Sequence, residues 1–135
     1  MKIEIMTISG CPNASGTLRL VTDVLAAEGL EAQVTTVEIK EVAEAKARGF
    51  LGSPTVRVDG ADIETARREE RTPSLSCRVY PAATGLAGTP PREMIRAALR
   101  AALRAALRAA LRAALRAALR AALRAALRAA LRAAR

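Results

Sequence analysis

Apolar residues in the first half of the chain follow two different periods. Short runs rich in Ile and Val, in which apolar and polar residues tend to alternate, favour β-strands, whereas apolar residues three or four positions apart favour helices. These patterns come in the order strand, helix, strand, helix, and a glycine, Gly29 or Gly49, ends each helical pattern. We therefore expect strands over residues 2–8 and 32–39 and helices over residues 14–28 and 41–48.

A second pair of strands follows the second helix. An alternating run begins at Pro54 and ends at the Asp59–Gly60 pair, a dipeptide typical of tight hairpin turns. We expect it to turn back into a short strand over residues 61–63. Residues 64–91 show no clear periodicity, which predicts a long functional loop or a partly ordered insertion. Within this segment we expect the charged cluster at 67–71 to be solvated surface and Tyr80 to be a packing residue.

The last helical pattern opens at Pro91 and continues into a perfect repeat. The unit Arg-Ala-Ala-Leu recurs nine times between Arg96 and Leu131. Because Ala, Leu and Arg are among the best helix formers, we expect one continuous helix of about 40 residues. Four residues advance about 400° around a helix, so the leucine row drifts about 40° per unit and forms neither a fixed apolar face nor a coiled-coil seam. The residues expected to pack on the sheet before the row turns away are Met94, Ile95, Leu99 and Leu103.

These patterns predict a folded domain over residues 1–103 and a low-complexity helical extension over residues 104–135. Expansion of a short repeated DNA unit accounts for the perfect periodicity of the extension. The functional alternatives are non-specific anionic partners, either nucleic acid phosphates or anionic membrane surfaces, that bind the arginines.

The net charge of +9 is concentrated in the repeat. From Arg96 onward there are 11 arginines and no acid, whereas residues 1–95 hold 11 Lys and Arg against 13 Asp and Glu, a net charge of −2. No apolar run approaches the ~18 residues that a membrane span needs. The first residues also lack the long apolar core of a signal peptide. We therefore expect a cytoplasmic protein without a transmembrane segment.

The candidate chemistry rests on two cysteines, Cys11 and Cys77, in a chain without histidine. The commonest general base and the commonest protein zinc ligand are both missing, and no cofactor is expected. Cys11 lies in the turn Gly10-Cys11-Pro12-Asn13, directly before the first predicted helix. A helix N-terminus favours the thiolate, which is the reactive form of cysteine. Cys11 is therefore the candidate nucleophile.

The element order βαβαββα, together with the Gly10-Cys11-Pro12-Asn13 and Ser53-Pro54-Thr55-Val56 segments, resembles the thioredoxin and glutaredoxin superfamily over about residues 1 to 103. More narrowly, the GCPN, GSPTVRVDG, SCRVY and GTPPREMIRAAL segments resemble a group of small bacterial thioredoxin-like proteins often labelled alkylmercury lyase-like. The resemblance implies an α/β thioredoxin-like domain whose last helix is extended by the repeat. It also implies a nucleophilic Cys11 and a cis peptide bond at Pro54. The residues that it places around a disulfide or small-thiol substrate are Pro12, Asn13, Ser53 and Pro54, with the carbonyl group of Ser53 or its neighbours beside the substrate.

The chain departs from a dithiol oxidoreductase because Ala14 stands where the second cysteine would be. Another thiol must therefore resolve a mixed disulfide on Cys11, either a small thiol such as glutathione or Cys77. In the predicted topology, the loop after the fourth strand emerges at the Cys11 end of the sheet, which brings Cys77 into reach. The plain alternative for Cys77 is that of a small buried apolar residue.

A second class of function is the binding of a thiophilic metal, mercury or copper, by Cys11 and Cys77. Alkylmercury lyase-like activity would also need a proton donor near the two sulfurs. The nearest acids in the sequence are Asp59 and Asp62, and the hairpin puts Asp59 at the opposite end of the sheet. A purely structural or adaptor role is the third alternative.

Overall fold

A computed structural model describes all residues, 1–135, and they fall into two compact units, Met1–Ala102 and Leu103–Arg135. The helices and strands follow one another as β1 (Lys2–Thr7), α1 (Ala14–Glu28), β2 (Gln33–Glu38), α2 (Val42–Arg48), β3 (Thr55–Val58), β4 (Ala61–Asp62), the 3₁₀ turn η1 (Thr65–Arg67), β5 (Tyr80–Ala82), β6 (Gly85–Ala87) and α3 (Arg92–Ala133). The four strands and three helices predicted by periodicity are all present, with ends that differ by one or two residues.

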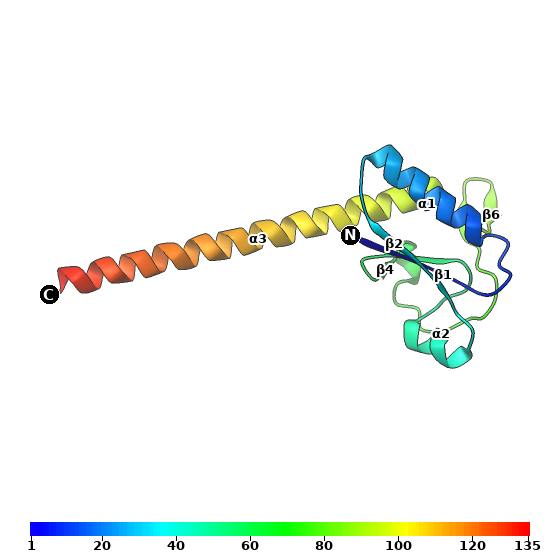
Figure 1. Cartoon of the computed structure of the whole chain (residues 1–135), viewed down its shortest axis with the longest axis horizontal. Coiled ribbons are helices and arrows are strands. Elements are labelled where there is room, and N and C mark those ends of the chain that lie inside the picture. The colour runs from blue at the N-terminus through cyan, green and yellow to red at the C-terminus, as the bar shows by residue number, and fades with distance from the viewer. The chain divides into compact units, whose positions relative to one another are not determined.

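The main sheet has the strand order β2-β1-β3-β4 (Figure 1). β1 pairs with β2 in parallel and with β3 antiparallel, and β4 adds antiparallel to β3. The hairpin between β3 and β4 turns at Asp59 and Gly60, whose φ angles of 48° and 83° are both left-handed, as a type I′ turn requires. The α/β architecture and the predicted hairpin are therefore confirmed.

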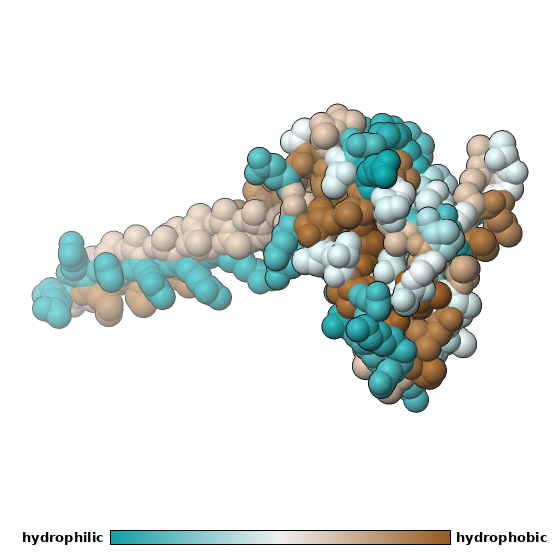
Figure 2. All heavy atoms as spheres, turned by 45° about the vertical axis from the view of Figure 1, so that its right-hand side comes forward, coloured by the Kyte–Doolittle hydropathy of each residue, from teal (hydrophilic) through white to brown (hydrophobic).

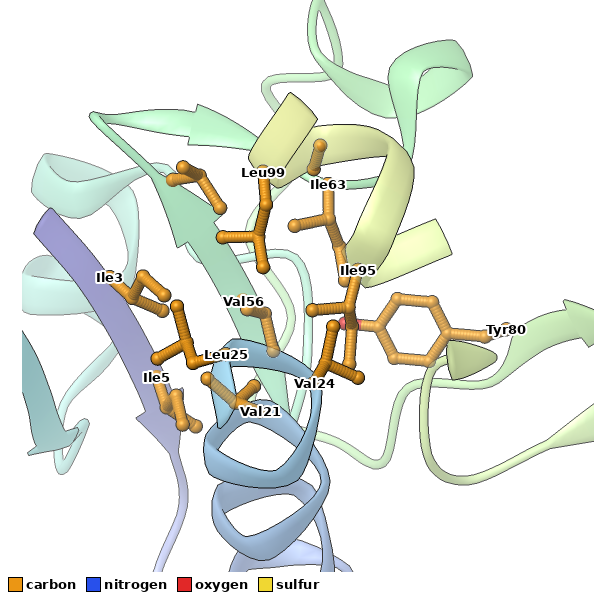
Figure 3. Packing of buried hydrophobic residues seen from close by; sticks show 12 residues of the cluster. Ile3, Ile5, Val21, Val24, Leu25, Val56, Ile63, Tyr80, Ile95 and Leu99 are labelled. Atoms are coloured by element: carbon orange, nitrogen blue, oxygen red, sulfur yellow. The ribbon is translucent and has the colours of Figure 1, made fainter. Parts of the chain in front are cut away.

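Helices cover both faces of this sheet. On one face, buried residues of β1 and β3 pack against α1 and the first turns of α3 (Figure 3). On the other face, Met6 of β1 packs with Ala45 of α2 and with Phe50. Side chains of a strand point alternately to its two faces, and β1 therefore buries Ile3 and Ile5 on one side and Met6 on the other. The result is a three-layer domain with a hydrophobic core on each face of the sheet.

The segment expected to be a loop or an insertion contains regular structure. η1 follows β4, and β5 and β6 form an antiparallel hairpin with Tyr80 paired to Ala87. Strands of three residues are too short to show a period in the sequence, which is why the pattern predicted none. Two further expectations are confirmed: Tyr80 is fully buried, and the 67–71 cluster is exposed or half-buried, with Arg67 paired to Glu70.

The predicted final helix is present as α3. Within the first unit it buries Ile95, Ala98 and Leu99, and Met94 and Ala102 pack at the edge of the same core. The expectation for Leu103 was wrong: this side chain is 48% exposed. Each step of four residues turns about 40° further around the helix, so Ala102 rather than Leu103 follows the buried face after Leu99.

In the second unit, α3 continues to Ala133 and every leucine from Leu107 to Leu131 is at least 60% exposed. None of the helices, α3 included, combines the length and the apolar character needed to cross a membrane.

Candidate functional site

Cys11 lies in the turn that joins β1 to α1. Its backbone N–H donates a hydrogen bond to the carbonyl oxygen of Ile8 (3.3 Å), and its own carbonyl accepts one from Ala14 (3.3 Å), the first residue of α1. Asn13 is the residue that caps the helix, although its side chain makes no capping hydrogen bond. Pro12 is exposed and Cys11 is half-buried. The turn thus presents a partly accessible thiol directly before a helix.

Ser53 and Pro54 lie beside this turn. Their peptide bond is cis, as the resemblance implied, and both residues are buried. The hydroxyl oxygen of Ser53 accepts a hydrogen bond from the backbone N–H of Ile8 (3.0 Å). Because Ile8 also accepts the hydrogen bond from Cys11, a short chain of bonds connects the cysteine turn to the segment that precedes β3.

Cys77 pairs with this same segment. Ser53 and Cys77 form an isolated parallel β-bridge, in which the Ser53 N–H donates to the carbonyl of Ser76 (2.8 Å) and the Ser53 carbonyl accepts from the N–H of Arg78 (2.8 Å). The carbonyl that the resemblance places beside a substrate is therefore bonded to the chain's own Cys77 segment. Cys77 is exposed, which excludes the plain alternative of a buried apolar residue.

Gly52 permits this close pairing. Its φ angle is +113°, a conformation that glycine adopts without strain. A Cβ atom at this position would also lie 3.1 Å from the Cβ of Arg78 and 3.2 Å from the carbonyl oxygen of Ser76. Any larger residue would push the Cys77 segment away from the Ser53–Pro54 segment.

The comparison with known families matches residues 1–63 to the model described as Thioredoxin domain. The matched region runs from β1 to the end of the β3–β4 hairpin and includes the Cys11 turn and the cis proline. This match and the α/β architecture give the chain a thioredoxin-like fold. No curated protein and no solved structure gave a match.

In this thioredoxin-like domain, Arg78 is the main residue of the site region that sequence reasoning missed. Its side chain is fully buried, and its guanidinium donates two hydrogen bonds to Asp62 (2.8 and 2.9 Å) and one to Glu64 (2.9 Å). A further hydrogen bond reaches the hydroxyl of Thr55 (3.2 Å). Burial disfavours the charge, but the hydrogen bonds that Arg78 donates to Asp62 and Glu64 outweigh this effect and raise the pKa of Arg78 above its usual range. The residue after Cys77 is thereby fixed to β3, β4 and the turn that follows.

Tyr80 also connects the Cys77 segment to Pro54. Its hydroxyl donates to the carbonyl of Pro54 (2.7 Å), and the Arg78 guanidinium stacks on its ring at 4.4 Å from the centroid. Burial raises the pKa of Tyr80 well above its usual value, so this hydroxyl stays protonated and remains a donor. From Cys77 to Tyr80, exposed and buried side chains alternate, as in a strand. Such alternation could have indicated a strand in the sequence. It was concealed because the inward residue Arg78 is charged and not apolar.

Asn13 contacts the end of the β5–β6 hairpin. A Cβ atom on Gly88 would lie only 2.3 Å from the side-chain nitrogen of Asn13, so the two residues are closely packed. An open hollow of about 380 Å³ borders the cysteine turn at Ile8 and Ser9. It is also lined by Leu75, which precedes Cys77 by two residues, and by Glu38, Ile39 and Lys40.

Both candidate proton donors, Asp59 and Asp62, already have hydrogen-bond partners. Asp59 accepts a hydrogen bond from the N–H of Lys2 (2.7 Å), at the end of β1 that is remote from Cys11. Asp62 is buried and bonded to Arg78. No group of three or more Cys, Asp or Glu side chains lies close enough to hold a metal ion.

Proposed function

We propose that this thioredoxin-like protein is a thiol-disulfide redox protein in which Cys11 is the nucleophile and Cys77 is the resolving thiol. The observation that carries the proposal is the β-bridge between Ser53 and Cys77. It brings the second cysteine to the segment that also holds the Cys11 turn through the Ser53 hydroxyl. Ala14 stands where a second cysteine would resolve the Cys11 disulfide, and in this proposal Cys77, which is distant in sequence, takes that role.

The reaction proceeds in two exchange steps. The Cys11 thiolate attacks one sulfur of a substrate disulfide, the substrate S–S bond breaks, and the departing sulfur takes up a proton. The Cys77 thiolate then attacks the Cys11 sulfur and releases the second substrate thiol. Two electrons pass from the two cysteines to the substrate, and a Cys11–Cys77 disulfide remains. A small thiol such as glutathione, or a dithiol reductant, returns the protein to its reduced state.

The remaining site residues position the two cysteines for this exchange. The cis Pro54 and the buried Ser53 border the two cysteine segments, and Pro12 and Asn13 shape the turn that presents Cys11. A substrate disulfide would approach from the solvent side, where Pro12 and Cys77 are exposed. A reducing, cytoplasmic setting suits the proposal, because it keeps both thiols available.

Differential alkylation with mass spectrometry, on reduced and on mildly oxidised protein over a range of pH, tests the proposal. We expect Cys11 to alkylate rapidly, because it directly precedes the N-terminus of α1. On oxidation we expect a linked Cys11–Cys77 peptide. Cys77→Ser should trap the mixed disulfide with a substrate, whereas Cys11→Ser should abolish reaction with the substrate. Ordinary reactivity of Cys11 together with no linked peptide would overturn the proposal.

Binding of a thiophilic metal by the same two thiols is the second candidate. It is favoured by two free cysteines on segments that both contact Ser53, since soft thiolates select ions such as Cu(I) or mercury, whereas zinc requires four ligands. The two candidates differ in one readout. A resolving thiol forms a reversible disulfide under mild oxidant, whereas a metal partner stays reduced and binds one ion per chain.

A further inference from the structure

The second unit, Leu103–Arg135, carries all of the excess charge. Nine of the 22 Lys and Arg residues lie in it and no acid does, which leaves 13 basic residues against 13 acids in the first unit. The first unit is therefore neutral, and the second has a charge of +9. Such a concentration of one sign attracts polyanions over a distance set by the salt concentration.

The arginines of the second unit differ from the two repeat arginines in the first. Arg96 and Arg100 both bind the carboxylate of Glu28, at 2.7 and 2.9 Å, and so belong to the fold of the domain. From Arg104 onward the unit contains no carboxylate side chain with which an arginine could pair. Figure 2 shows arginine side chains along the length of this helix. Eight guanidinium groups, from Arg104 to Arg132, are thus available to a partner.

The arrangement of these groups restricts the partner. Successive arginines are four residues apart, which is a rise of about 6 Å and a turn of about 40°. From Arg104 to Arg132 the row therefore covers about 42 Å and winds through about 280°. A straight or flat partner faces an arc of about 120°, which holds only about four consecutive arginines. A flexible chain can follow the whole winding row.

The leucine row winds in the same way, and it excludes two other partners. A helix that lies on a membrane needs a fixed apolar face, and a coiled coil needs a fixed apolar seam. The leucines from Leu107 to Leu131 are instead exposed on successive sides of the helix. We infer that the second unit binds single-stranded nucleic acid, whose flexible phosphate backbone follows the winding row of arginines. It has no aromatic side chain on which a base could stack, so the binding is independent of base sequence.

The salt dependence of binding tests this inference on the full chain. Neutralising eight phosphates of a single strand gives a slope of log Kobs against log salt of about −6, whereas about four phosphates of a rigid duplex give a slope of about −4. We would measure both slopes by fluorescence anisotropy with a labelled oligo(U) RNA, an oligo(A) RNA and a DNA duplex of similar length. The expected result is the steeper slope for both single strands, with equal affinity for U and A.

Two variants of the full chain serve as controls. Replacing the eight arginines from Arg104 to Arg132 by Gln keeps a good helix former at each position and should remove binding of all three probes. A second variant has the same composition but spaces the arginines alternately three and four residues apart, which puts them on one face of the helix. For this variant, the slope for the duplex should become steeper, about −7, while the slope for single strands stays near −6.

Several outcomes would overturn the inference. They are equal slopes for duplex and single strand in the original chain, a duplex slope that does not respond to the respaced variant, and RNA binding that survives the Gln variant. Tighter binding to phosphatidylcholine–phosphatidylserine vesicles than to RNA at the same salt would show that the partner is a membrane. None of these outcomes bears on the thiol chemistry of Cys11 and Cys77, which alkylation tests separately.

Discussion

At the scale of single residues, Arg78 connects stability to the candidate site. Its guanidinium lies among Asp62, Glu64, Thr55 and Tyr80, and its backbone N–H holds Ser53. A buried ion pair adds little stability compared with apolar side chains of the same size, but the loss of one partner leaves a buried charge uncompensated. Arg78 is thus needed both for the fold and for the place of Cys77.

We predict that Arg78→Met lowers the free energy of unfolding by about 3–5 kcal/mol, because Asp62 and Glu64 then lose their cationic partner. Urea unfolding measures the change. The matched control is Arg67→Met, which breaks the more exposed pair with Glu70 and should have a much smaller effect. If Arg78→Met does not fold, the double variant with Asp62→Leu should recover part of the stability. Equal effects of the two single variants would contradict this prediction.

At the scale of elements, α1 and the first turns of α3 are joined by packing and by charge. Their apolar faces share one core, and Glu28 at the end of α1 binds both Arg96 and Arg100 of α3. The hydrogen bond from Arg100, with further attraction from Arg96, lowers the pKa of Glu28 below its ordinary value. The pairing of these helices therefore depends on pH.

The sign of this dependence follows from the lowered pKa. Glu28 stabilises the folded state fully above its ordinary pKa of 4.5, and its contribution is lost as the pH falls through the lower value of the folded state. We predict that Glu28→Gln lowers the urea midpoint at pH 7 and that the difference from the original chain shrinks below pH 4.5. The exposed Glu31, changed to Gln, is the control and should show little difference at either pH. A difference for Glu28→Gln that stays constant down to pH 3 would show that the pair contributes nothing through its charge.

At the scale of the whole molecule, two units share one helix. The buried residues of α3 end at Leu99, with Ala102 at the margin of the core, and the compact first unit ends at the same place. We propose that residues 1–103 form a domain that folds without the repeat.

A chain that stops after Leu103 should therefore keep its urea midpoint, with a change in the free energy of unfolding of no more than about 0.5 kcal/mol, because the residues it lacks bury nothing in the core. Circular dichroism should show the loss of the repeat helix. The control is a chain that stops after Ala97, which lacks the buried Ala98 and Leu99 and should unfold or aggregate. A large loss of stability in the chain that stops after Leu103 would place the domain boundary further along the repeat.

Local patterns in the sequence determined most of the elements. Alternation and helical spacing predicted β1 to β4 and the three helices, and glycines marked where α1 and α2 end. The cis bond at Pro54 was implied only by the family resemblance. The Asp59–Gly60 pair predicted the hairpin, and the Gly10-Cys11-Pro12-Asn13 segment predicted the Cys11 turn. These features are determined by interactions between near neighbours, which is why the sequence contains them directly.

Only the tertiary structure decided what surrounds Cys77. The bridge to Ser53, the inward Arg78 and the hydroxyl contact of Tyr80 with Pro54 join residues 23 to 26 positions apart. An arginine is buried only when distant carboxylates compensate its charge, and the sequence does not state that Asp62 and Glu64 will meet it. The same holds for Leu103, whose exposure depends on which face of α3 packs in the core and not on its own apolar side chain.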